Sequence, residues 1–374
     1  MTDIDLLPRE HEEDLRASVR RLFEAESSAE FVAGLYDDPT ADTSKLDRAW
    51  AQELGLAALL VPEELGGAGA SASEAAVVSE EIGRAVAPVR FLSSAVLATT
   101  LAVHLKAQSL LAGLTAGERF AAIAFPATAA RIDSGIEIAV EGGSATVSGT
   151  VPGVIDGVGA DDYLVVAGEG VDTVVVRVSA EHVQAEPFLG FDQSRQLADL
   201  SFTHAPAEVL GHGLDAAAAV RAAEILGRTV LAAEQAGLAQ RAFDLTLEYV
   251  KGRRQFGRTI GSFQAVKHRL ADLWLEVSQA GAAAIFAART AAASEAGEEL
   301  PDEAELCSLV AGSYASTAAV HAAEEAVQLH GGNGMTWEYP LHLYLKRAKA
   351  DEQILGHSRR QRQQLAPLID LPTA

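Results

Sequence analysis

The sequence predicts an α+β fold in which helices flank a middle segment of strands. Apolar residues recur at helical spacing through residues 8–118, short β-branched runs separated by turn residues fill 119–212, and helical spacing then returns. We therefore expect an N-terminal α-helical domain over 1–118, a middle β-domain over 119–212 and a C-terminal α-helical domain over 213–374.

Composition and charge describe a large acidic protein. The 374 residues are 49% hydrophobic, which allows substantial buried cores, and the formal net charge is −23. This charge disfavours nucleic acid and anionic membrane surfaces as partners, because both would repel it. Cys307 is the single cysteine, so an intramolecular disulfide is excluded. A cytoplasmic protein without signal peptide or transmembrane segment is expected.

The first 118 residues show helical periodicity in three stretches. In the first two, apolar side chains at helical spacing share one face: Leu15, Val19 and Leu22, and then Leu46, Trp50 and Leu54. The proline and paired glycines of VPEELGGAG (61–69) break the pattern, and the third stretch restarts after serine caps. Helices packed on helices explain every residue in this part.

The middle segment changes to short runs that are rich in β-branched residues. Gly, Asp and similar turn residues separate these runs, which favours strands over helices. Five strands are expected, over residues 136–140, 144–151, 162–168, 172–179 and 198–205.

The stretch from Arg228 to Gln264 is the most informative. A long amphipathic helix is predicted to end at Gly252, and a tight basic and aromatic turn, RRQFG (253–257), follows it. A second helix is predicted to begin near Ser262.

Two motifs in the last third resemble the signatures of the acyl-CoA dehydrogenase family. They are GLAQRAFDLTLEYVKGRRQFGRTIGSFQAVKHRLAD (237–272) and AVQLHGGNGMTWEYPLHLYLKRAKAD (326–351). Together with VPEELGGAG, the resemblance covers nearly the whole chain. It implies the acyl-CoA dehydrogenase fold with a C-terminal four-helix bundle, FAD as cofactor, an acyl-CoA substrate and an electron-transfer flavoprotein as acceptor.

The resemblance also implies that FAD is shared across a subunit interface. The β-domain of one subunit would pack on the isoalloxazine ring, and the C-terminal helices of its neighbour would hold the pyrophosphate and adenosine. Arg253 can present a planar fork of donors to pyrophosphate, and Phe256 can pack beside adenine. Further contacts, including glycines that admit close backbone approach, are expected from Gln255, Phe263, Gln264, Gln328, Gly331 and Gly332. The alternative is that these motifs only join or end helices.

The residues expected around the flavin ring depart from the family pattern. Ala124 and Phe125 stand where a Thr-Glu pair usually precedes the proline, here Pro126. A later Trp and Thr that contact the ring in the family are replaced by Gly153 and Ile155. Because packing and a hydroxyl donor are both lost, we expect that this β-domain does not hold the ring.

The catalytic glutamate of the family is missing from both of its known positions. Leu355 and Gly227 stand there, and neither can abstract a proton. Glu352 and Glu224 are weak substitutes, because each lies about one turn, ~5 Å, from the expected place. Other ionisable groups are expected to be surface charges (Glu234 and Glu248) or structural or solvent-facing (His330 and His357). No metal site is expected.

Three hypotheses follow from this pattern. The leading one is a non-catalytic subunit that completes the FAD site of a paralogous chain, similar to the α2β2 acyl-CoA dehydrogenases of actinobacteria, several of which act on steroid side chains. The second is a self-sufficient dehydrogenase with a displaced base, Glu352 or Glu224. The third is a flavin-free binding or scaffold protein that has kept the fold.

Overall fold

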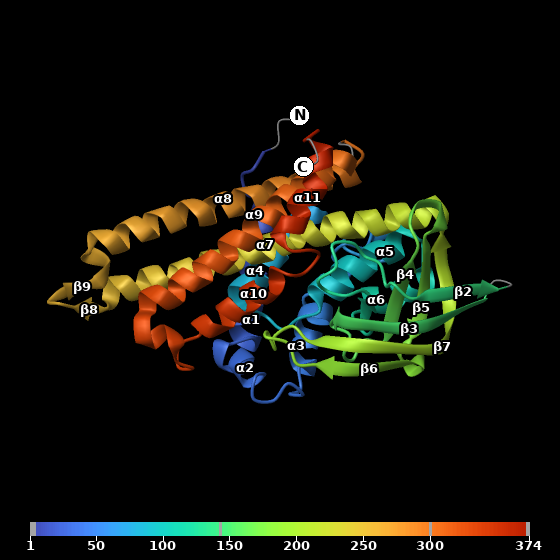
Figure 1. The fold of residues 1–374 in the computed structure, drawn as a ribbon, viewed down its shortest axis with the longest axis horizontal. Coiled ribbons are helices and arrows are strands. Elements are labelled where there is room, and N and C mark those ends of the chain that lie inside the picture. The colour runs from blue at the N-terminus through green and yellow to red at the C-terminus, as the bar shows by residue number, and fades with distance from the viewer. Residues whose placement is uncertain (1–4, 142–143, 299–300, 372–374) are drawn as a thin grey trace.

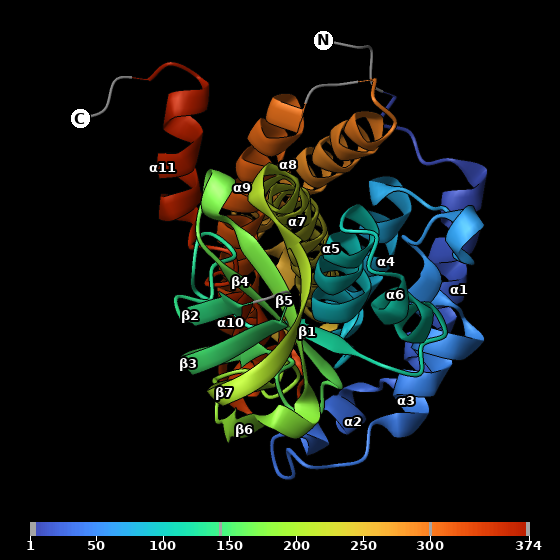
Figure 2. The ribbon, with the colours of Figure 1, turned by 90° about the vertical axis from the view of Figure 1, so that its right-hand side faces the viewer.

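A computed structural model of the chain describes residues 5–141, 144–298 and 301–371. A long helical body carries the sheet at one end, and the N-terminal helices pack along its side (Figure 1). Seen from the sheet end, the strands lie beside the N-terminal helices, and one helix, α7, runs back from the sheet through the bundle (Figure 2).

The N-terminal part is helical, as predicted, but its helices are interrupted. The third predicted stretch begins at Ser71, whose Oγ accepts a hydrogen bond from the Ser73 amide at 3.2 Å. The second predicted stretch, which carries Leu46, Trp50 and Leu54, becomes a short α-helix followed by π-helical and 3-10 turns. The elements are α1 (Glu10–Glu26), α2 (Ala29–Gly34), α3 (Ser44–Arg48), η1 (Ala49–Glu53), η2 (Leu56–Ala58), η3 (Glu63–Leu65), α4 (Ala72–Ala85), η4 (Phe91–Ala98), α5 (Thr99–His104) and α6 (Gln108–Thr115).

The middle part is a seven-stranded sheet with the order β1-β4-β5-β7-β3-β2, and β6 also pairs with β7. Among the described residues of this sheet, β1 pairs with β4 in parallel and the other pairs are antiparallel. The five predicted strands are confirmed, and the prediction missed β1 and β6. The strands are β1 (Ala121–Ile123), β2 (Glu137–Glu141), β3 (Ser144–Ile155), β4 (Asp162–Ala167), β5 (Val174–Ser179), β6 (Val183–Phe188) and β7 (Leu197–His212); 3-10 turns η5 (Gly170–Asp172) and η6 (Ala180–His182) join them.

The C-terminal part is a helical bundle built around α7, a helix of 40 residues that ends at Gly252 as predicted. A small hairpin then leads into a second long helix that begins at Gln264, close to the predicted start. The elements are α7 (Gly213–Gly252), β8 (Arg254–Gln255), β9 (Arg258–Thr259), η7 (Ile260–Ser262), α8 (Gln264–Glu295), α9 (Pro301–His330), η8 (Gly331–Met335), α10 (Leu341–Asp351) and α11 (Ser358–Leu368).

Helices α4 and α7 cross in direct backbone contact, and this contact requires glycine on both sides. A Cβ added to Gly237 would lie 2.0 Å from the Glu80 carbonyl oxygen, and one on Gly83 would lie 1.9 Å from that of Glu234. No real side chain can approach so closely. The N-terminal helices are therefore locked onto the middle of α7. Within the described ranges, no helix is both long and apolar enough to cross a bilayer.

Candidate cofactor-binding site

The basic turn lies at the end of the bundle farthest from the sheet (Figure 1). Residues 253–258 are exposed, and Phe256 is 91% exposed with a φ of +49°. Residues 251–267 include no Asp or Glu and contribute five cations: Lys251, Arg253, Arg254, Arg258 and Lys267. We call residues 251–267 the basic tip. A local positive charge of this kind can attract a diphosphate despite the acidic chain.

Aromatic contacts stiffen the basic tip. The guanidinium carbon of Arg258 lies 3.9 Å from the centre of the Phe263 ring. Phe256 meets the same ring edge-to-face, with 6.3 Å between the ring centres. The turn therefore presents an exposed Phe256 ring next to the exposed Arg253 and Gln255. Gln264 is exposed at the start of α8.

The second motif, around the glycines that follow α9, lies at the same end of the bundle. Tyr249 of α7 stacks on His330 with 4.0 Å between the ring centres, and its hydroxyl donates to the His330 carbonyl at 3.3 Å. Gly331 has a φ of +60°, which favours glycine, and both it and Gly332 are exposed. Tyr249 thus joins the glycine turn to the last turns before the basic tip. Gln328 is exposed there as well.

The two positions expected for a catalytic glutamate lie side by side at the junction of sheet and bundle. A Cβ on Gly227 would lie 3.1 Å from Leu355 Cδ1 and 2.5 Å from Leu97 Cδ2. Leu355 is fully buried, and its amide donates to the Ala127 carbonyl at 3.0 Å. This spot, which we call the junction, is filled by leucine side chains.

A segment that follows β1 closes the junction from the sheet side. The Ile132 amide donates to Glu224 Oε1 at 2.7 Å, and Ile132 belongs to the same apolar core as Leu355. A Cβ on Gly356 would lie 2.9 Å from the Ala130 Cβ. The segment 127–132 therefore packs directly on α7 and on the turn after α10.

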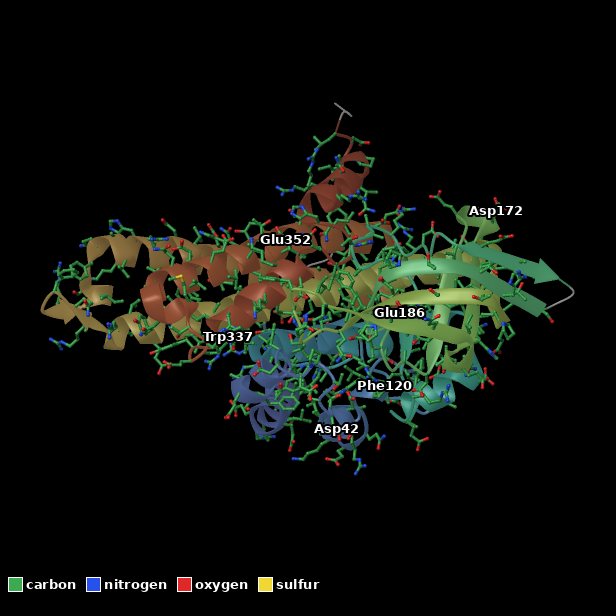
Figure 3. The ribbon with its side chains drawn as sticks, turned by 60° about the horizontal axis from the view of Figure 1, so that its bottom comes forward. Asp42, Phe120, Asp172, Glu186, Trp337 and Glu352 are labelled. Carbon is green, nitrogen blue, oxygen red and sulfur yellow. The ribbon has the colours of Figure 1, made fainter. Side chains whose placement is uncertain are left out.

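The two substitute carboxylates both have partners. Glu224 is 5% exposed, and its Oε2 lies 3.7 Å from Nη1 of the buried Arg228. Burial raises the pKa of Glu224, and the nearby Arg228 opposes that rise. Glu352, labelled in Figure 3, directly follows α10, and its Oε1 lies 3.2 Å from His357 Nε2. Glu224 and Glu352 therefore both interact with nearby residues of this chain.

The sheet positions that depart from the family pattern are structural here. The Gly153 amide donates to Asp199 Oδ1 at 2.7 Å, and its carbonyl accepts from the Ala127 amide at 3.1 Å. Ile155 is buried, as are Ala124 and Phe125. These residues serve the packing of the sheet against the junction.

The prediction that Glu234 is a surface charge is wrong, whereas Glu248 is exposed as expected. Glu234 is 2% exposed and accepts hydrogen bonds from Arg195 and Arg347, each at 2.8 Å. Burial acts to raise the pKa of Glu234, but the two guanidiniums outweigh it and the pKa is lowered. Arg195 also donates to Asp351 at 2.9 Å. Glu234 is buried because other helices surround α7, so polar side chains of α7 contact protein and not solvent.

The two expected histidines are structural. His330 is buried beneath Tyr249, and its Nδ1 lies 2.7 Å from the Ala326 carbonyl oxygen. His357 accepts a hydrogen bond from the Arg359 amide and so caps α11.

Comparison with known proteins identifies the fold. Residues 9–108 match the model of the acyl-CoA dehydrogenase N-terminal domain, and residues 217–368 match that of the C-terminal domain. The acyl-CoA dehydrogenase IpdE2 of Mycobacterium tuberculosis is 35% identical over 360 residues, which cover 95% of this chain and 96% of IpdE2. The chain belongs to the acyl-CoA dehydrogenase family.

Two solved structures superpose on nearly the whole chain. The ChsE4-ChsE5 complex of Mycobacterium tuberculosis is 27% identical with a TM-score of 0.85, covering 99% of this chain and 100% of that one. A variant of the Tcur3481-Tcur3483 steroid ACAD is 28% identical with a TM-score of 0.85, covering 96% of this chain and 98% of that one. The roles of the individual residues in this chain stay predictions.

Proposed function

We propose that this chain is a cytoplasmic subunit of a heteromeric FAD-dependent acyl-CoA dehydrogenase, and that it completes the FAD site of a paralogous subunit without supplying a catalytic base. One observation carries the proposal. The spot where both glutamate positions meet is filled by Leu97 and Leu355, whereas the basic tip at the other end of α7 is exposed. The names of the two similar solved proteins, ChsE4-ChsE5 and Tcur3481-Tcur3483, each join two chains. This supports a paralogous partner for the present chain.

The junction offers no room for a glutamate side chain on Gly227. A general base must come within hydrogen-bonding distance of the proton that it removes. At the junction, the side chains of Leu97 and Leu355 lie against Gly227, and the Leu355 amide is hydrogen-bonded to the Ala127 carbonyl. The partner subunit therefore provides the glutamate and the acyl-CoA pocket.

The basic tip would hold the pyrophosphate and adenosine of a FAD whose ring lies on the partner. Bound there, FAD supplies the hydride acceptor for α,β-dehydrogenation. Arg253 would donate a pair of hydrogen bonds to pyrophosphate, and Phe256 would pack on adenine. Gly331 and Gly332 would let backbone amides approach the cofactor, with Gln255, Phe263, Gln264 and Gln328 around them.

The substrate of the assembled enzyme is proposed to be an acyl-CoA thioester. A steroid side-chain thioester is favoured, because one similar solved protein is a steroid ACAD. An electron-transfer flavoprotein is the expected acceptor.

A second candidate, a self-sufficient dehydrogenase, is favoured by Glu224 alone. A buried carboxylate with a raised pKa beside the junction is the kind of group that serves as a general base. In that case the segment 127–132 would have to move away from Glu224.

Turnover of acyl-CoA by the chain alone, by its paralogue alone and by the two together distinguishes these candidates. We expect activity only for the pair, lowered at limiting FAD by Arg253→Ala and kept on Arg359→Ala, which removes an exposed arginine of α11. Glu224→Gln and Glu352→Gln should leave the activity of the pair unchanged. Turnover by the lone chain that disappears on Glu224→Gln would instead establish the second candidate.

A further inference from the structure

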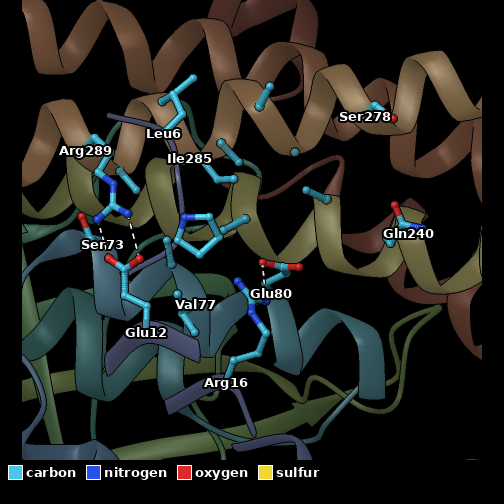
Figure 4. Close-up of a pocket in the computed structure, with 18 of the residues that line it drawn as sticks. Leu6, Glu12, Arg16, Ser73, Val77, Glu80, Gln240, Ser278, Ile285 and Arg289 are labelled. Atoms are coloured by element: carbon cyan, nitrogen blue, oxygen red, sulfur yellow. Dashed lines mark hydrogen bonds and ion pairs between the residues drawn. The ribbon is translucent and has the colours of Figure 1, made fainter. Parts of the chain in front are cut away.

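A cavity of about 410 Å³ lies between α1, α4, α7 and α8 (Figure 4). None of its lining residues belongs to the basic tip or to the residues that fill the junction. Its walls are mostly apolar and small, with contributions from Ala76, Val77, Ala233, Ala236, Gly281 and Ile285. The size is within the range of ligand-binding pockets, and the lining suits hydrocarbon.

One end of the cavity is polar. Ser73, Glu12 and Arg289 meet there, from three different helices (Figure 4). Ser73 is 5% exposed and Arg289 is 8% exposed. Within the described part of the chain, Ser73 Oγ and Arg289 Nε are buried without a hydrogen-bond partner. Buried polar atoms are usually paired, so two unpaired ones in residues that line the same end of an apolar cavity indicate that a polar group of a ligand can be held there.

The charge at this end is already balanced. Arg289 Nη2 donates to Glu12 Oε2 at 2.8 Å, and Nη1 contacts the other carboxylate oxygen. Along the wall, Arg16 Nη1 lies 2.7 Å from Glu80 Oε2. An anionic ligand would have to compete with Glu12 for Arg289, and a cationic one would have to compete with Arg289 for Glu12. Ser73 Oγ and Arg289 Nε remain able to form hydrogen bonds, and these two atoms suit an uncharged polar group.

We propose that this cavity binds an uncharged amphipathic lipid. Its hydroxyl or carbonyl oxygen accepts a hydrogen bond from Arg289 Nε–H and a second one from the Ser73 hydroxyl. Its hydrocarbon body lies against the alanines of α4, α7 and α8. The ligand thereby satisfies both polar atoms and fills the apolar space between the N-terminal helices and the bundle.

Calorimetric titration of the full chain with 1-decanol tests this site. We expect saturable binding of one molecule per chain, weakened about fivefold by Ser73→Ala, which removes one neutral hydrogen bond. Decanoate should bind at least about tenfold more weakly, because its charge would have to leave water without a free counter-ion.

A cavity-filling variant tests the location. A Cβ on Gly281 meets nothing within 4 Å, so Gly281→Leu can be accommodated, and its side chain should abolish decanol binding. Gly34→Leu is the matched control, because Gly34 is also helical with open space around its Cβ and lies outside the cavity.

Three results would overturn the proposal: no saturable binding to the unmodified chain, binding that persists unchanged in Gly281→Leu, or equal affinity for decanol and decanoate. The first would mean that water alone satisfies Ser73 and Arg289. None of these measurements involves flavin or turnover, so the lipid site can fail while the proposed function stands.

Discussion

Helix α7 and the basic tip that follows it lie in opposite environments. Around Gly227 the helix is enclosed, with Leu97, Leu355 and the segment 127–132 packed against it. Beyond Gly252 the chain turns through exposed arginines and an exposed phenylalanine. The buried positions of α7 stabilise the fold, whereas the basic tip leaves Arg253, Gln255 and Phe256 exposed.

This contrast predicts that substitutions in the buried part and in the basic tip have separate effects. Changes at buried positions of α7 and of the junction should lower the free energy of unfolding and leave cofactor affinity in the heteromer unchanged. Changes at the basic tip should do the reverse.

The largest effect is expected for Glu234→Ala. This substitution leaves Arg195 and Arg347 buried without one of their counter-ions, which typically lowers the free energy of unfolding by about 3–5 kcal/mol. Urea denaturation measures the loss. Glu248→Ala, an exposed site on the same helix, should change stability by less than about 0.5 kcal/mol. Equal effects of the two substitutions would refute the buried ion pairs of Glu234 with Arg195 and Arg347.

Leu355→Ala should lower the free energy of unfolding by about 2–5 kcal/mol, because it opens a cavity in a fully buried position. Leu214→Ala is the control, since Leu214 is 66% exposed at the start of α7. If Leu355→Ala is as mild as the control, the junction is not packed as described.

Arg253→Ala should weaken FAD binding by the heteromer about 10-fold to 100-fold, through loss of hydrogen bonds to a charged group. Equilibrium titration with FAD measures the affinity, and urea denaturation should show a change in stability below about 0.5 kcal/mol. A loss of stability with unchanged FAD affinity would mean that Arg253 belongs to the fold.

The smallest effect is a pH dependence at Glu224. Burial holds its folded-state pKa above the ordinary value of 4.5, so the folded protein binds this proton more tightly than the unfolded chain. The stabilisation is complete below pH 4.5 and is lost as pH rises through the folded pKa. Glu224→Gln keeps an acceptor for the Ile132 amide but removes this slope. Unfolding titrations across pH should show the unmodified protein losing stability relative to the variant. Parallel pH curves would contradict the raised pKa.

The sequence predicted the elements whose signals are local. Periodicity placed the long helices, and the glycine and basic turn marked the end of α7 at Gly252. The missed strands β1 and β6 carry weak local signals: β1 reads Ala-Ala-Ile, and β6 contains Glu and Pro. They are strands because β4 and β7 pair with them.

The interior contacts were not predictable from local pattern. Glu234 lies in a polar interval of α7, and its partner Arg195 comes from the loop before β7, so only the tertiary fold brings them together. The adjacency of Gly227 and Leu355 likewise depends on the packing of α7 against the turn after α10. Domain boundaries at 118/119 and 212/213 stay predictions.

The flavin content of the purified chain, alone and with its paralogue, tests the central claim most directly. We expect the lone chain to be colourless, and the mixed assembly to be yellow with about half as many flavins as chains. A yellow homo-oligomer with one FAD in every chain would contradict the proposal, because this chain would then hold the whole cofactor by itself.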